Sequence, residues 1–146
     1  MGTEKTFVAF DLATTTGFAV GTKDSLITSG AFRAKKPSES ITRGELLHRF
    51  KTFVILLLNQ YADQRKDVVI YFELVEFVVS RLAYKIHCEL AGALQLIAHE
   101  RGIPIYGIPV GTIKKHATTK GNAKKEVMIA AATRKFPDVE IADDNH

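Results

Sequence analysis

Two acidic residues stand where apolar segments of the chain end. Asp11 follows the apolar run at residues 7–10, and Glu73 closes a second run that starts at Val68. Continuous apolar runs of this length are typical of strands buried on both faces, so each carboxylate is expected where a buried strand meets a loop. A carboxylate removed from water must be paired, hydrogen-bonded or bound to a cation. One such acid could simply cap a turn, but two in the same setting favour a cation site.

A third group of acids lies at the end of the chain. Residues 136–146 contain a dense acidic cluster that includes Asp143 and Asp144. Acidic tails are usually solvated. If this cluster instead returns to the two strand-end acids, the carboxylates need a cation to stay ionised together, and their hard oxygen atoms favour Mg²⁺ or Mn²⁺.

A basic stretch precedes the last predicted helix. Residues 110–125 hold five lysines and one histidine, and no acid occurs until Glu126. Lysines mixed with small polar residues are typical of segments that contact a phosphate backbone without reading bases. A solvated basic face is the simpler alternative. The candidate nucleic-acid contacts are Lys114, Lys115, His116, Lys120, Asn122, Lys124 and Lys125.

Asn122 is expected to cap the helix that follows it. That start would place Lys124 and Lys125 in the first helical turn, where positive charge opposes the helix dipole. An anion bound at this helix terminus would turn the unfavourable placement into a favourable one. The pattern therefore favours phosphate binding.

The first half of the chain predicts a strand meander and a helix. After the strand before Asp11 and a tight turn at residues 14–17, short strands are expected at 18–20 and at 26–28 with 31–32. Thr42 and Glu45 have capping-box spacing, and apolar residues then recur at helical spacing to Tyr61. A long amphipathic helix should therefore cover one sheet face.

The second half predicts alternating strands and helices. Apolar residues from Leu82 to Ile97 indicate a second helix that stops near Gly102, residues 103–108 form another strand, and a further helix begins near Pro109. The expected fold is α/β, with a mixed sheet and helices on both faces. Crossover chirality should place the strand at Val68 beside the first strand, so that both strand-end acids meet at one sheet edge.

Composition is that of one soluble domain. The chain has 146 residues, 46% of them hydrophobic and 25% charged, with a net charge of +4. It contains no apolar run near the roughly 20 residues of a membrane span and no signal-peptide pattern. Cys88 is the single cysteine, so no internal disulfide can form. We expect a single domain over residues 1–146 in the cytoplasm.

The chain resembles RuvC-type Holliday junction resolvases, especially the phage-type branch. The resemblance rests on four motifs in order: Phe-Asp-Leu-Ala-Thr-Thr-Thr-Gly at 10–17, Tyr-Phe-Glu-Leu-Val at 71–75, the block at 102–117 and Ala-Asp-Asp-Asn at 142–145. It implies an RNase H-like (ribonuclease H-like) fold with a mixed five-stranded sheet. It also implies a two-metal endonuclease that acts as a homodimer on four-way DNA junctions.

The resemblance also implies roles for individual residues. Asp11 would bridge two Mg²⁺ ions, for which Mn²⁺ could substitute, Glu73 would hold one ion, and Asp144, or as second choice Asp143, would hold the other. Lys114 and Lys125 match basic positions of the family in kind and spacing.

The helix near residues 81–101 corresponds to the helix through which family members form dimers. Family members often place an aromatic residue three positions after the acid at the end of the second buried strand, and here Phe77 stands one position later. Phe77 would act as a wedge between junction bases unless it packs in the core.

The family pattern continues beyond the terminal acids to another aspartate on a final helix. This chain stops at His146 before such a residue. We therefore expect a domain that lacks its final C-terminal helix, and either a missing fourth metal ligand or partial substitution by His146.

Three other functions share features with this sequence. A related nuclease acting on RNA or other branched DNA would use the same site, and a catalytically impaired DNA-binding module would bind DNA without cutting it. The spacing Asp-x-x-x-Thr-x-Gly at 11–17 also occurs in the phosphate loop of actin-like ATPases. An ATPase of that class needs a second phosphate loop and a second domain, for which 146 residues leave no room.

Overall fold

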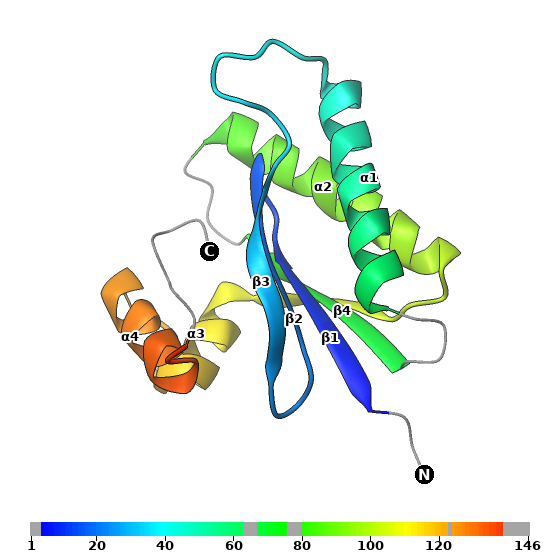
Figure 1. Ribbon diagram of the computed structural model, residues 1–146. Coiled ribbons are helices and arrows are strands. Elements are labelled where there is room, and N and C mark those ends of the chain that lie inside the picture. Colours follow the sequence, from blue (N-terminus) through cyan, green and yellow to red (C-terminus); the bar gives the residue numbers. More distant parts are fainter. Residues whose placement is uncertain (1–3, 63–66, 76–79, 123, 139–146) are drawn as a thin grey trace.

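The computed structural model describes residues 4–62, 67–75, 80–122 and 124–138 (Figure 1). In chain order the elements are β1 (Lys5–Asp11), β2 (Thr15–Gly21), β3 (Leu26–Arg33), α1 (Arg43–Tyr61), β4 (Asp67–Leu74), α2 (Arg81–Glu100), β5 (Ile105–Pro109), α3 (Val110–Thr118) and α4 (Lys125–Lys135). No helix among these residues is both long and apolar enough to cross a membrane.

The five strands form one mixed sheet in the order β3-β2-β1-β4-β5. β1 pairs antiparallel with β2 and parallel with β4, and β4 pairs parallel with β5. The prediction that the strand at Val68 lies beside the first strand is therefore confirmed. Parallel pairing brings the carboxyl ends of β1, β4 and β5 to one edge of the sheet.

The first hairpin is longer than its sequence suggested. β2 begins at Thr15, so most of the expected turn at residues 14–17 is already strand, and β3 runs unbroken through Gly30. Gly17 pairs with Asp11 on one side and with Ala31 on the other. Strand pairing on both sides of β2 overrides the turn preference of this segment.

The core lies between the sheet and the helices α1 and α2, which cover one face (Figure 1). Its fully buried side chains include Val8 and Ile70 from the sheet, Phe50 and Leu58 from α1, and Leu94 from α2. Successive strand residues point to opposite faces, so Ala9, Asp11, Tyr71 and Glu73 point away from this core. Helix α3 approaches that second face, where its Ile113 lines a hollow together with strand residues.

Helix α1 begins as predicted. Thr42 is its N-cap and accepts a hydrogen bond from the Glu45 N–H at 3.1 Å. Removing such a cap usually costs about 1 kcal/mol. The Glu45 carboxylate does not complete a capping box, because it pairs with Arg49 at 3.0 Å.

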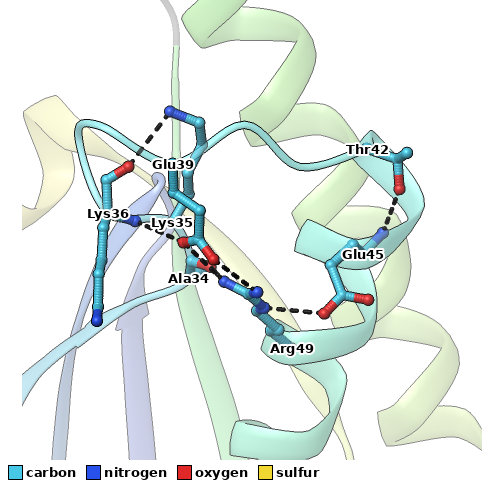
Figure 2. A network of polar contacts seen from close by, with 7 residues as sticks. All are labelled: Ala34, Lys35, Lys36, Glu39, Thr42, Glu45 and Arg49. Carbon is cyan, nitrogen blue, oxygen red and sulfur yellow. Dashed lines mark hydrogen bonds and ion pairs between the residues drawn. The ribbon is translucent and has the colours of Figure 1, made fainter.

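Arg49 links α1 to the connection that precedes it (Figure 2). Its guanidinium donates to both Glu39 carboxylate oxygens at 2.9 and 2.8 Å and to the Ala34 carbonyl at 3.2 Å. Hydrogen bonds from Arg49 and from the Lys36 N–H lower the pKa of Glu39 to about 2. This network fixes how β3 passes into α1.

Candidate active site

Asp11 and Glu73 come together at the carboxyl edge of the sheet. Asp11 is the last residue of β1, and Glu73 is the next-to-last residue of β4. Phe10 lies directly beside Phe72 in the parallel pair, so the residues that follow them share one level of the sheet. Both acids line one hollow of about 430 Å³. The predicted convergence of these two carboxylates is confirmed.

The hollow lies over the open face of the sheet. Small residues on neighbouring strands, Ala9, Gly17, Ala19 and Ser29, leave the space that larger side chains would fill. The other lining residues are mainly apolar: Phe10, Phe18, Tyr71, Phe72, Ile108 and Ile113. Among the residues that the structure describes, these two carboxylates are the acidic groups of a mainly apolar lining.

The charge state of the pair reflects this setting. Burial raises the pKa of Glu73, the nearby Asp11 carboxylate raises it further, and the Lys114 ammonium partly offsets the rise. Burial also raises the pKa of Asp11, and His87 opposes that rise. Asp11 nevertheless keeps part of its surface exposed to solvent. Two carboxylates that disfavour joint ionisation form a site that gains from a bound cation.

His87 is a buried neighbour of Asp11 that the sequence pattern does not reveal. It lies in α2, is only 7% exposed, and its Nδ1 is 3.2 Å from the Leu12 carbonyl oxygen. The signal was its helical spacing from Leu90, Ala91 and Leu94, which are buried on the same face of α2. The sequence pattern instead predicts an apolar stripe that begins at Leu82, which is 58% exposed.

Helix α3 brings part of the basic stretch to the site. Lys114 is half-buried and lies close enough to Glu73 to affect its pKa. Lys115 and His116 follow in the last turn of α3 and are exposed. Lys114 is therefore placed beside the acids, and its two neighbours face solvent.

The turn between α3 and α4 is ordered by Thr118 and Thr119. The Thr118 hydroxyl accepts from the Lys120 N–H at 3.2 Å, and Thr119 adopts a left-handed conformation with φ of 69°. Lys120, Asn122 and Lys124 are all exposed.

The expectation that Asn122 caps the following helix is wrong. The N-cap of α4 is Lys124, which makes no side-chain cap hydrogen bond. The Lys124 carbonyl accepts from the N–H groups of Val127 and Met128, so the helix begins two residues later than its composition suggested. Asn122 lies in the preceding turn, and Lys125 is the first helical residue.

Several candidate residues lie outside the described residues. These are Phe77 and the terminal group Asp143, Asp144 and His146. Within the described ranges, no group of three or more histidine, cysteine, aspartate or glutamate side chains forms a metal site.

The Asp11–Glu73 pair suits a hard divalent cation. The pair offers carboxylate oxygens, the donors that Mg²⁺ and Mn²⁺ prefer. The negative charges of the two carboxylates repel one another, and a bound cation would relieve that repulsion. Magnesium is usually held by one or two carboxylates and completes its shell with water and substrate phosphate. The residues present therefore fit a metal that also binds a phosphate ligand.

Comparison with known proteins shows similarity in structure. No protein-family model matches the chain, and no curated protein matches it significantly in sequence. A structure of RuvC from Thermus thermophilus in complex with a Holliday junction substrate superposes with a TM-score of 0.77 at 18% identity, covering 94% of this chain and 82% of that one. A second Thermus thermophilus RuvC structure gives 0.76 at 21% identity, covering 96% and 86%. The chain has the RNase H-like fold, in the form that RuvC has.

Proposed function

We propose that this chain is a metal-dependent, structure-selective endodeoxyribonuclease that resolves four-way DNA junctions, as a RuvC-like enzyme of the phage-type branch. The observation that carries the proposal is the Asp11–Glu73 pair at the carboxyl edge of β1 and β4, in a fold shared with RuvC. Sheets of this kind bind ligands at that edge. Recombination, repair or phage DNA processing would supply such junctions.

Asp11 and Glu73 would hold Mg²⁺, with Mn²⁺ as a substitute, and Asp144 or Asp143 would complete the site. The bound metal would activate a water for in-line attack on phosphorus and stabilise the leaving 3′ oxygen. Lys114, beside Glu73, would offset phosphate charge near the scissile bond. Lys125, at the start of α4, is proposed for the same task.

The exposed basic residues around the α3–α4 turn would position the DNA backbone. Lys115, His116, Lys120, Asn122 and Lys124 are all exposed to solvent. Phosphate contacts fix the register of a duplex without reading its sequence. Preference for junctions would then come from the shape of the DNA. Phe77 is proposed to act as a wedge between junction bases.

A homodimer through α2 would present two sites to two strands symmetrically. The helix exposes large apolar side chains near both ends, with Leu82 at 58% and Leu96 at 59% exposure. These exposed leucines would be available to such an interface. Sedimentation equilibrium of the wild type and of Leu96→Glu tests this part: a dimer that the substitution dissociates supports it, and a wild-type monomer at tens of micromolar argues against it.

The nuclease proposal is tested with a synthetic four-way junction and a linear duplex of the same sequence, in Mg²⁺ and in Mn²⁺. The wild type should cut the junction in preference to the duplex. Asp11→Asn and Glu73→Gln should lose cleavage but keep junction affinity, since each removes a negative charge near phosphate. An RNA–DNA hybrid and a flap substrate test the alternative of a related nuclease that acts on RNA or other branched DNA. A wild-type rate in Asp11→Asn, or equal cutting of junction and duplex, would refute the proposal.

A further inference from the structure

The turn after β1 is held by hydrogen bonds at three successive carbonyl groups. The Leu12 carbonyl lies 3.2 Å from His87 Nδ1, the Ala13 carbonyl accepts from the Thr16 hydroxyl at 2.8 Å, and the Thr14 carbonyl accepts from the Ala34 N–H at 2.9 Å. The three partners come from α2, from β2 and from the segment after β3. Asp11 immediately precedes this turn, so its position depends on all three.

The His87 bond differs from the other two. A carbonyl can only accept, so Nδ1 must carry a proton, which fixes the orientation of the ring. His87 reaches the turn across 75 residues of sequence, while Thr16 is three residues from its partner. His87 and Leu12 are both buried, at 7% and 3% exposure, so water cannot readily replace the bond.

We propose that His87 is a positioning residue for the active site: through the Leu12 carbonyl it holds the Asp11 carboxylate in place for the metal and the scissile phosphate. The proposal rests on the proposed function of Asp11. The electrostatic effect of His87 on the pKa of Asp11 places the imidazole near that carboxylate as well. Residues that hydrogen-bond a metal ligand directly typically change metal affinity or activity about 10- to 100-fold when replaced, and we expect an effect of that order from His87, whose bond is to the adjacent backbone.

Two substitutions separate the hydrogen bond from the packing. His87→Asn keeps an N–H donor close to the place of Nδ1, and His87→Phe keeps an aromatic ring but has no donor. Val54→Ala is the matched control, because it removes volume from a fully buried position in α1 and should lower stability without touching the turn. Asp11→Asn serves as the reference for complete loss of the metal ligand.

The first readout uses the metal-free protein. In ¹H–¹⁵N spectra, His87→Phe should broaden or duplicate the amide signals of residues 12–14, whereas Val54→Ala and His87→Asn should leave them single. In the wild type a long-range ¹H–¹⁵N spectrum should show a protonated Nδ1 on His87. This spectrum tests the His87–Leu12 hydrogen bond even if His87→Phe does not fold, because an unprotonated Nδ1 overturns the proposal.

The second readout is Mn²⁺ affinity and junction cleavage. His87→Phe should weaken Mn²⁺ binding and lower kcat about 10- to 100-fold, with junction affinity nearly unchanged, and His87→Asn should restore most of both. An equal loss in Val54→Ala, or wild-type values in His87→Phe, overturns the proposal. If Asp11→Asn binds Mn²⁺ like the wild type, the proposed function fails instead, and the His87 proposal is then decided by the amide signals alone.

Discussion

Gly107 is a position where one methyl group should disturb both the sheet and the candidate site. It lies in β5 opposite Phe72, the residue before Glu73. A Cβ atom at this position would lie 2.7 Å from Leu74 Cδ2, 2.8 Å from Leu74 Cγ and 3.0 Å from Phe72 Cζ. Ordinary contacts of a Cβ atom begin near 3.4 Å, so Gly107→Ala forces its neighbours to move.

The expected cost follows from two opposing effects. Overpacking of this kind costs about 1–3 kcal/mol, and the lower half of that range applies because Leu74 is 38% exposed and can rotate toward solvent. Alanine also stabilises a strand interior relative to glycine by about 0.5–1 kcal/mol. Gly107→Ala should therefore lower the free energy of unfolding by about 1 kcal/mol, a fall in Tm of roughly 3–4 °C.

Urea unfolding followed by circular dichroism measures this change, provided that the m-value stays constant. A double-mutant cycle with Leu74→Ala identifies its cause, because that change removes the two closest atoms. In the Leu74→Ala background, Gly107→Ala should be neutral or slightly stabilising, giving a coupling of about 1 kcal/mol. On the proposed function, Gly107→Ala should also slow cleavage more than it weakens binding, since Glu73 follows Phe72.

The control is Gly44→Ala in the exposed first turn of α1. The nearest atom to its added Cβ is Thr42 Oγ1 at 3.9 Å, so the substitution should stabilise the protein by up to about 1 kcal/mol. Stabilisation of the protein by Gly107→Ala would refute the predicted overpacking against Leu74. An equal effect of Gly107→Ala in the wild type and in Leu74→Ala would also refute it.

Three further predictions follow from the charges. In the metal-free protein, Asp11→Asn should lower the pKa of Glu73 and Lys114→Met should raise it, because Asp11 raises and Lys114 lowers that pKa. A ¹³C NMR titration of the Glu73 carboxyl measures both changes, and changes of the opposite sign would contradict the geometry. Lys120→Ala should weaken junction binding and reduce the slope of log affinity against log salt concentration by about 0.9, whereas Lys125→Ala should lower turnover more than affinity. Equal effects on turnover and affinity in both variants would argue against Lys125 at the scissile phosphate. The folded-state pKa of Glu39, about 2, lies below its ordinary value of 4.5, so the stability that Glu39 contributes is present above pH 4.5 and is lost as pH falls toward 2. The difference in Tm between wild type and Glu39→Gln should accordingly shrink over that pH range, and a constant difference would show that the Arg49 pair contributes nothing.

The acid pair could be predicted from sequence because its signal is local. Each carboxylate ends an apolar run, and the right-handed crossover rule places two such strands side by side. The long helices could be predicted because their apolar residues recur at helical spacing and their ends carry characteristic residue types, Thr42 at the N-cap of α1 and Gly102, with φ of 66°, directly after the C-cap Arg101 of α2. These features depend on short-range chemistry that a single sequence records.

Features that depend on tertiary packing could not be predicted in the same way. Apolar residues occur around more than one side of α2, so the sequence does not determine which side faces the sheet, and buried His87 was missed while exposed Leu82 was assigned to the stripe. The start of α4 was misplaced because Asn122 has the chemistry of a cap, but the backbone turns into the helix only at Lys124. In α2 the deciding contacts come from elsewhere in the fold.

Metal binding at the acid pair is the most direct test of the central claim. Paramagnetic Mn²⁺ added at substoichiometric amounts broadens ¹H–¹⁵N signals near its site. We predict selective broadening of the signals of residues around Asp11 and Glu73, competition by Mg²⁺, and loss of the effect in Asp11→Asn. Broadening centred elsewhere, or broadening near the pair that persists in Asp11→Asn, would contradict it.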